Sequence, residues 1–228
     1  MKKVILAFVL VLLFVNIAFA AELIYKKGTV QIMRKGQDFW IQANPGARVE
    51  EGDKVKTFKG SVCEIAFDSA KKNILKVDED TQVTMESFGQ TVVSMDKGKV
   101  LSRLKGLEAG STFEVRTPTA VAGAAGTGWG VETDGQRTTV LVFENSVYLC
   151  SPRNPNEKRI ISEGNKTTIS RLDRIGVVDF VILTRLDNDR WGTWVKELEE
   201  RLEEKGRMDR LRELDDRIKD RFGDTQDR

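Results

Sequence analysis

The chain contains no histidine among its 228 residues and only two cysteines, Cys63 and Cys150. Without histidine, the Ser-His-Asp and Cys-His nucleophile systems and histidine-based metal sites are excluded. The cysteines lie on different expected strands, so they make no thiolate metal site. We therefore predict no catalytic residue, no metal and no cofactor, and a protein that is not an enzyme.

Carboxylates leave one enzymatic alternative open. The paired carboxylates of glycoside hydrolases meet in space and have no local signature, so an enzyme acting on envelope polysaccharide remains an alternative. The acidic run Asp78-Glu79-Asp80 lacks the Asp-x-Asp-x-Asp-Gly pattern of a calcium loop and its distal glutamate. This run predicts a solvated turn.

Long apolar runs are absent outside the N-terminus. There, Lys2 and Lys3 precede an apolar run from Val4 to Phe19, and Ala18-Phe19-Ala20 closes it. This order is typical of a secretory signal peptide, residues 1–20, cleaved after Ala20. An uncleaved anchor is the alternative, although the run is marginal for about 30 Å of hydrocarbon. We expect a periplasmic or secreted protein of a bacterial envelope, with no stable membrane span after cleavage.

An excess of charge of one sign is also absent. The formal net charge is +2, and loss of Lys2 and Lys3 with the signal peptide leaves zero. A neutral chain has no overall field that would attract nucleic acid or acidic membranes. We therefore expect no nucleic-acid partner.

The two cysteines favour a disulfide only if both face the same way. An oxidising compartment permits the bridge. Cys63 shares the apolar face of its run with Ile65, whereas Cys150 alternates with the apolar Val147 and Leu149. One thiol is expected to be buried and the other exposed, which disfavours a bridge. A bend in either strand would defeat this counting.

Short alternating runs separated by Gly, Asp, Asn and Lys fill the chain from residue 22 to residue 183. Runs of this kind, spaced by about 8–12 residues, predict an all-β domain. We expect a single sandwich- or solenoid-like domain, mainly β, over residues 22–183. The polar segment 151–158 holds two of the four prolines and predicts an exposed loop. The apolar segment 176–183 predicts a last strand or a docking segment.

The composition changes near Asp187. Residues 187–228 are highly charged and predict an amphipathic helical tail, with a possible break near Gly206, where the apolar phase slips. The expected use of the helix is packing on the β domain through Trp191 and Trp194. A coiled-coil partner helix, including one from a second copy in a homo-oligomer, is the alternative.

The run from Phe113 to Thr133 carries four glycines and raises the question of phosphate binding. A P-loop needs a lysine after its glycines, and none follows in this run. A dinucleotide turn needs a helix after its glycines, whereas Asp134-Gly135 predicts a hairpin. We therefore predict a structural bend with Gly126 in a crowded turn, and no nucleotide.

The same run shows an ordered pattern of an aromatic and a valine, Thr-Pro-x-Ala, Gly-Thr, an aromatic and a valine, and a valine-rich strand. The residues that carry it are Phe113, Val115, Thr117, Pro118, Ala120, Gly126, Thr127, Trp129, Val131, Val140, Val142, Glu144 and Val147, with Trp40, Gly52 and Asp53 upstream. This pattern resembles the FecR domain family over roughly residues 22–170. The resemblance implies a structural role for these residues and a β-rich fold that is solenoid-like or sandwich-like.

The chain departs from the FecR pattern in three ways. The family arginine before Gly-Thr is replaced by Ala125. The family glycine after Glu144 is replaced by Asn145, which can still take a left-handed turn. The membrane regulators of the family carry a cytoplasmic sigma-factor-binding domain, whereas this chain is expected to start with a signal peptide. Direct control of a sigma factor by this polypeptide is therefore not expected.

FecR domains occur in the periplasmic parts of iron-transport regulators and in many secreted proteins. The main functional prediction is a secreted or periplasmic, non-enzymatic binding or scaffold module of the cell envelope. Its expected partner is a protein or an envelope polymer. The alternative is an extracytoplasmic sensor or signalling component that acts through a separate membrane regulator.

Overall fold

Alternating runs form strands in the computed structural model, which describes residues 21–107, 110–171 and 179–222. The chain divides into two units, residues 1–182 and residues 183–228. The described part of the first unit contains two nine-stranded sheets, and the described part of the second contains one long helix. The predicted mainly β fold with a C-terminal helix is confirmed. The expected signal peptide lies outside the described residues.

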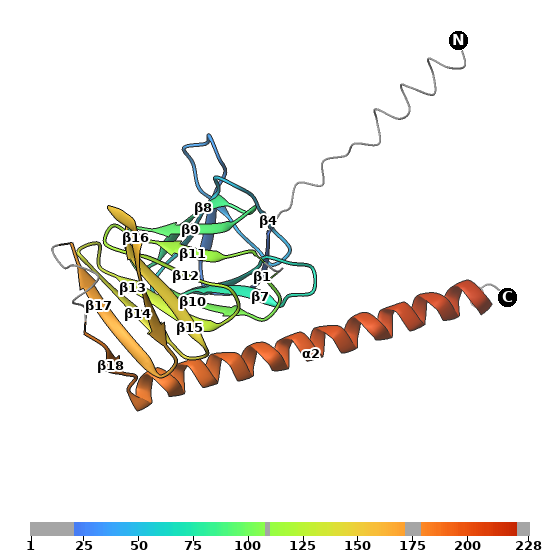
Figure 1. Ribbon diagram of the computed structural model, residues 1–228. Coiled ribbons are helices and arrows are strands. Elements are labelled where there is room, and N and C mark those ends of the chain that lie inside the picture. The colour runs from blue at the N-terminus through green and yellow to red at the C-terminus, as the bar shows by residue number, and fades with distance from the viewer. Residues whose placement is uncertain (1–20, 108–109, 172–178, 223–228) are drawn as a thin grey trace, which may run out of the picture. The chain divides into compact units, whose positions relative to one another are not determined.

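Sheet A contains nine strands (Figure 1). In spatial order across the sheet they are β18 (Val181–Ile182), β17 (Asn165–Ser170), β14 (Arg137–Val142), β13 (Gly128–Thr133), β10 (Gly98–Leu104), β7 (Asn73–Val77), β6 (Val62–Ala66), β1 (Ala21–Lys27) and β4 (Arg48–Val49).

Sheet B also contains nine strands. Their spatial order is β16 (Asn154–Ser162), β15 (Ser146–Ser151), β12 (Val121–Ala124), β11 (Phe113–Arg116), β9 (Thr91–Met95), β8 (Gln82–Ser87), β5 (Lys54–Thr57), β2 (Val30–Met33) and β3 (Ile41–Gln42).

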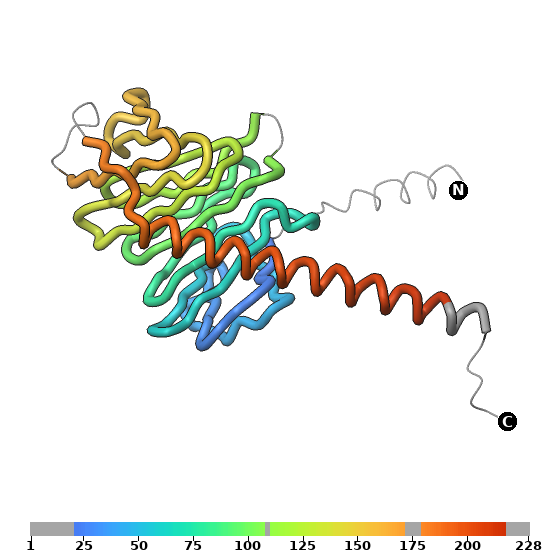
Figure 2. Tube along the Cα trace, turned by 90° about the horizontal axis from the view of Figure 1, so that it is seen from below, coloured from blue at the N-terminus to red at the C-terminus, as the bar shows by residue number. Residues whose placement is uncertain are grey.

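Both sheets follow the order of the sequence almost without exception. Successive hairpins alternate between the sheets: β6 and β7 lie in sheet A, β8 and β9 in sheet B, β13 and β14 in sheet A, and β15 and β16 in sheet B. The colour in Figure 2 therefore passes along the β unit from blue through green to orange. The predicted sandwich and solenoid each describe part of this arrangement, because two sheets share a core while the chain advances along both.

The pairing is antiparallel except between β9 and β11. The chain leaves sheet B after β9, forms β10 in sheet A, and returns to sheet B as β11. This visit to the other sheet lets β11 run in the same direction as β9. A direct hairpin between them would be antiparallel.

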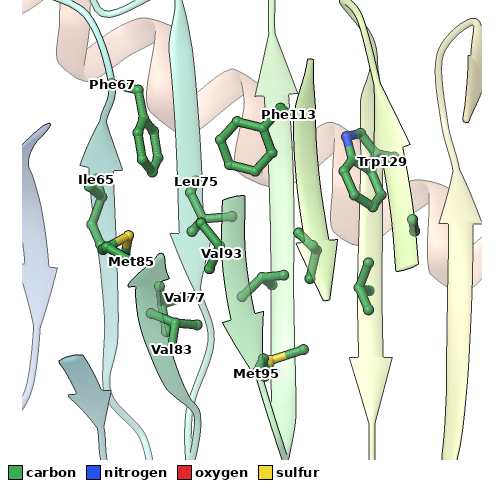
Figure 3. Close-up of a cluster of buried hydrophobic side chains, with 14 of the residues drawn as sticks. Ile65, Phe67, Leu75, Val77, Val83, Met85, Val93, Met95, Phe113 and Trp129 are labelled. Carbon is green, nitrogen blue, oxygen red and sulfur yellow. The ribbon is translucent and has the colours of Figure 1, made fainter. Parts of the chain in front are cut away.

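The core lies between the two sheets and consists of alternate residues of each strand. Leu75 and Val77 from β7 lie near Val83, Met85 and Val93 from β8 and β9 (Figure 3). All of these side chains are fully buried. Larger gaps are filled by aromatic rings, including Phe67 and Phe113, whose ring centroids lie 5.1 Å apart in a T-shaped contact.

The glycine-rich run differs from the prediction of a simple bend, because it contains a strand. β12 (Val121–Ala124) pairs with β11 on one side and with β15 on the other. Its four residues are small or β-branched and show no polar alternation, so periodicity does not distinguish them from a turn.

The prediction of a loop over residues 151–158 is wrong. β15 continues to Ser151, β16 begins at Asn154, and these two residues pair across a tight turn. The segment is exposed, as expected, but it forms the tip of a long hairpin. Pro155 is compatible with a strand because β16 is the last strand of sheet B, where a missing N–H interrupts no interior ladder.

Both cysteines are free thiols, and both are buried. Cys63 lies in β6 of sheet A and Cys150 in β15 of sheet B. The expected exposure of Cys150 is therefore wrong. The pairing of β15 with β16 shifts register between Leu149 and Ser151, so this position does not follow simple alternation.

The helix α2 (Arg185–Phe222) has a defined N-terminus. The Thr184 hydroxyl accepts the Asp187 N–H at 3.2 Å, and the Asp187 carboxylate accepts the Thr184 N–H at 2.9 Å. This reciprocal pair is a capping box with aspartate in the glutamate position. The Trp191 and Trp194 rings contact each other edge to face, with centroids 5.2 Å apart.

The helix continues through Gly206, where the sequence predicts a possible break. One glycine costs only about 1 kcal/mol relative to alanine in a helix interior. Ion pairs at i, i+4 lie on either side, including Glu197–Arg201 at 3.8 Å and Glu213–Arg217 at 2.8 Å. Such pairs each add a few tenths of a kcal/mol, and several of them offset part of the cost of the glycine.

Candidate partner-binding surface

The Thr-Pro motif forms the turn between β11 and β12. The Thr117 N–H donates to the Ala120 carbonyl at 2.9 Å. The Ala120 N–H donates to the Thr117 hydroxyl oxygen at 3.0 Å. Pro118 sets the backbone at the position after Thr117, where its ring favours a turn. The Thr117 hydroxyl thus accepts the Ala120 N–H at the point where the chain reverses, in place of a backbone carbonyl.

Thr138 of β14 connects this turn to the other sheet. Its hydroxyl lies 2.7 Å from that of Thr117 and 2.6 Å from that of Thr119. It also donates to the Thr133 hydroxyl at 3.2 Å. Thr138 is fully buried, and the other three threonines are less than a tenth exposed. The motif threonine therefore belongs to a buried hydroxyl network that joins sheet B to the β13–β14 hairpin.

Gly126 marks the crossing from sheet B to sheet A. Its φ is +117°, which an L side chain rarely adopts, and the nearest atom to an added Cβ is the Leu104 carbonyl at 3.9 Å. The expected crowding at Gly126 is therefore wrong, and backbone conformation explains the glycine. Asn145 has a φ of +56°, as predicted for a left-handed turn, and its side-chain amide donates to the Gly126 carbonyl at 3.1 Å.

The chain after Gly126 enters a strand, so the glycines have no helix N-terminus behind them. The Thr127 hydroxyl donates to the Glu144 carbonyl, and the Gly128 carbonyl accepts the Phe143 and Glu144 N–H groups at 2.9 and 3.0 Å. The backbone groups of this corner are engaged with the β14–β15 connection. They are not arranged to cradle a phosphate.

Most of the remaining motif residues are in the hydrophobic core. Each is at most 1% exposed. They are Phe113, Val115, Ala120, Trp129, Val131, Val140, Val142 and Val147.

Two of the upstream motif residues, Gly52 and Asp53, lie directly before β5. The Asp53 carboxylate forms a salt bridge with the Arg34 guanidinium at 2.6 Å, and it accepts a hydrogen bond from the Glu50 N–H at 2.9 Å. An added Cβ at Gly52 would lie 2.5 Å from the Lys35 side chain. Trp40 lies apart from them, with the Lys56 ammonium 5.8 Å from its ring centroid. These residues fix the β2 and β5 ends and are not brought together with the Thr-Pro turn.

A row of paired residues crosses the outer face of sheet B. Glu114 of β11 pairs with Gly123 of β12, Gly123 with Tyr148 of β15, and Tyr148 with Ile160 of β16. The Tyr148 hydroxyl donates to the Glu114 carboxylate at 2.5 Å. An added Cβ at Gly123 would lie 2.4 Å from the Tyr148 ring. Gly123 is therefore required because the phenol lies across it.

Charged side chains surround this row. Arg116 pairs with Glu114 at 3.0 Å and with Glu86 at 3.5 Å. The Lys158 ammonium lies 4.4 Å from the centroid of the Tyr148 ring, a cation–π contact. We call the six residues Glu86, Glu114, Arg116, Tyr148, Lys158 and Ile160 the outer patch.

The outer patch is suited to recognition rather than to proton transfer. Burial, together with the hydrogen bond to Glu114, raises the pKa of Tyr148, so the phenol stays neutral and acts as a donor. The neighbouring Cys150 thiol also has a raised pKa, mainly because of burial. A thiol that resists deprotonation is a poor nucleophile.

Within residues 21–107, 110–171 and 179–222, no group of three or more metal-ligating side chains could hold a metal ion. Over the same residues, no helix combines the length and apolar character needed to cross a membrane.

The outer patch could not be found from the motif, because none of its residues is a motif residue. Glu114 and Arg116 alternate with Phe113 and Val115 on β11. The polar positions of an alternating strand are the ones expected on its outer face. Only the order of the strands in the sheet shows that Glu114 and Tyr148 lie in contact.

Residues 53–148 match the family model described as FecR protein. The match begins at Asp53, next to β5, and ends at Tyr148 in β15. The resemblance to the FecR domain family is thus confirmed for this segment, which contains the Thr-Pro turn and the glycine-rich run.

Two crystal structures of a proposed anti-sigma factor from Parabacteroides distasonis ATCC 8503 are similar to this chain. One has 13% identity and a TM-score of 0.47, and the match covers 57% of this chain and 59% of that chain. The other has 14% identity and a TM-score of 0.47, with 62% and 64% covered. The chain therefore spans less than two thirds of the length of these structures. No curated protein matches the chain.

Proposed function

We propose that this chain is an extracytoplasmic component of a signalling system, which recognises a protein partner and passes a cue to a separate membrane regulator. The observation that carries this proposal is the match of residues 53–148 to the FecR family. That match favours the signalling alternative over a passive scaffold. The outer patch supports it by offering fixed charges and an aromatic ring on a rigid sheet.

The proposal requires the protein to leave the cytoplasm. Residues 1–20 have the pattern of a signal peptide. Ala21, which follows the expected cleavage point, is the first residue of β1. The intact mass of the protein purified from envelope fractions should correspond to a chain that begins at Ala21. A mass that includes residues 1–20, found only in membranes, would favour the anchored alternative.

A deletion strain distinguishes signalling from scaffolding. Loss of the gene should change the transcript levels of a defined set of genes, and the wild-type gene should restore them. Arg116→Glu should fail to restore them, because it reverses a charge in the outer patch where the side chain is 48% exposed.

Arg137→Glu is the matched control, since Arg137 is a 68% exposed arginine of sheet A outside the outer patch. Cooperative thermal unfolding of both variants should show that each is folded. Unchanged transcripts combined with a leaky or detergent-sensitive envelope would support the scaffold and refute signalling.

A further inference from the structure

The four sheet edges of the β unit are unequal. β3, β4 and β18 contain two residues each, whereas β16 contains nine. Edge strands present unpaired backbone groups, and proteins commonly keep them short to prevent pairing with another chain. Three edges of this unit follow that rule. β16 is longer, and residues 159–162 form its continuously paired part, because Pro155 and a register shift interrupt the part before Arg159.

The backbone of β16 is oriented to receive a strand at Ile160. The Glu163 N–H donates to the Asn145 carbonyl at 2.7 Å, and the pairing continues in register through Val147↔Ile161 and Tyr148↔Ile160. Because ladder bonds alternate in an antiparallel pair, the backbone groups of Ile161 face β15 and those of Ile160 face away. Among the described residues, no other backbone group hydrogen-bonds to the outward N–H or carbonyl of Ile160, so the edge is open to another strand at this residue.

The side chains beside this edge are apolar and basic. Ile160 is 57% exposed and lies next to Tyr148 on the outer face. Lys158, two residues earlier, shares that face and lies over the same ring. On the inner face, the Arg159 guanidinium lies 4.6 Å from the Phe180 ring centroid. Glu157, the one acidic residue of β16, accepts a hydrogen bond from Asn154 of the same strand.

A second copy of the chain complements this edge less well than a segment that carries an acidic residue. When two copies of β16 pair as antiparallel strands about a two-fold axis, the residue on the axis lies opposite the same residue of the other copy. A register centred on Ile160 places Lys158 opposite Ser162 of the other copy, which leaves the lysine without an opposite charge. Registers centred on Glu157, Lys158 or Arg159 place that residue opposite the same residue of the other copy. Like charges directly opposite each other destabilise a strand pair.

We propose that β16 binds an extended segment of a partner protein, which adds a tenth strand to sheet B. The segment carries an apolar residue beside Ile160 and, two positions further, an acidic residue beside Lys158. This inference rests on the proposed role in protein recognition, and it locates that recognition at the end of the outer patch.

The test uses the mature chain and a short synthetic peptide of threonines with Val-Thr-Glu at its centre. The control peptide carries lysine in place of the glutamate. Binding of the glutamate peptide should protect the Ile160 amide from hydrogen exchange, and the lysine peptide should bind about tenfold more weakly. Lys158→Glu should reverse this preference, which a loss of folding could not do.

A proline variant tests the backbone contribution. Ile160→Pro removes an N–H that faces away from β15, so the fold should be retained while peptide affinity falls about tenfold. Equal binding of both peptides, protection at another strand, or dimers of the wild type that Ile160→Pro dissolves would each overturn the proposal.

The peptide-binding test and the deletion-strain test can fail independently of each other. Altered transcripts without peptide binding at β16 would keep the signalling role and reject this edge. Peptide binding without altered transcripts would keep the edge and reject the role.

Discussion

Tyr148 and Gly123 form a matched pair of residues. Tyr148 reaches Glu114 only by lying across β12, and a Cβ at Gly123 would lie 2.4 Å from its hydroxyl oxygen. Gly123→Ala should therefore lower the free energy of unfolding by about 1–3 kcal/mol, as overpacking does. Urea denaturation of the mature chain measures this loss.

A second substitution identifies the cause of that loss. Tyr148→Ala in the Gly123→Ala background should recover most of the stability, because the clashing ring is gone. It should not rescue Gly126→Ala, whose cost comes from a φ of +117°. Gly89→Ala, with nothing within 4 Å of an added Cβ, is the control and should be nearly neutral. Equal costs at Gly123 and Gly89 would contradict the packing argument.

Cys63 gives stability a dependence on alkaline pH. Burial raises the pKa of its thiol from 9.0 to about 12, and the nearby Glu64 charge acts in the same direction. The folded protein holds this proton more tightly than the unfolded chain. The contribution of the thiol to the free energy of unfolding is therefore complete below about pH 9 and declines as the pH rises toward about 12.

Urea unfolding of wild type and Cys63→Ala over a series of alkaline pH values measures this dependence. The difference in unfolding free energy between them should be constant below about pH 9 and should shrink above it, because only the wild type loses the thiol contribution. A difference that does not change with pH would show that the thiol is not protected. Thiol reagents should likewise modify Cys63 only on unfolding.

At the scale of elements, the hydroxyl network ties the β11–β12 turn to the β13–β14 hairpin. Thr138→Val keeps the shape of the side chain but leaves three buried hydroxyl groups with one partner fewer. The expected cost is about 1–3 kcal/mol in the free energy of unfolding, measured by urea denaturation.

Thr139→Val is the matched control for that substitution. Thr139 is adjacent in the sequence, and its hydroxyl contacts Thr168 on an exposed face of sheet A. Its loss should stay within about 0.5 kcal/mol, as for most surface changes. Similar costs at both positions would mean that β-branched packing, and not the network, determines the stability of this region.

The helix α2 contains Gly206 in its interior, where an added Cβ would lie 3.7 Å from the Arg210 guanidinium. Gly206→Ala should stabilise the helix by about 0.5–1 kcal/mol, because alanine loses less backbone entropy. Slower amide hydrogen exchange in the turns around residue 206 would report this gain. Faster exchange there would indicate that the helix requires glycine at this position.

At the scale of the whole molecule, alternation in the sequence was sufficient to predict most strands and the β-rich fold class. The Asp134-Gly135 turn signal predicted the hairpin, and the resemblance to the FecR family led to the expected left-handed turn at Asn145. β12 was missed because its Ala122 and Ala124 side chains are small. Its Gly123 is required by the ring of Tyr148, which is on a strand distant in the sequence. The outer patch was missed for the same reason, since it exists only once β11, β12 and β15 are neighbours.

The buried interior also contains one pair that no pattern predicted. Trp129 and Ser102 are opposite each other on β13 and β10, and both are fully buried. The Trp129 indole N–H and the Ser102 hydroxyl have no hydrogen-bond partner among the described residues. Sequence reasoning assigns an aromatic residue to the core but cannot see whether its polar atom is satisfied.

The alternation of hairpins between the sheets has a mechanical consequence. Because each hairpin pairs with the neighbouring hairpins of its own sheet, which are also near it in the sequence, stability is distributed along the unit and not concentrated in one nucleus of distant contacts. A load applied between the two ends of the β unit would detach one hairpin at a time. The β unit would then unfold stepwise under tension and could refold from whichever end remains folded.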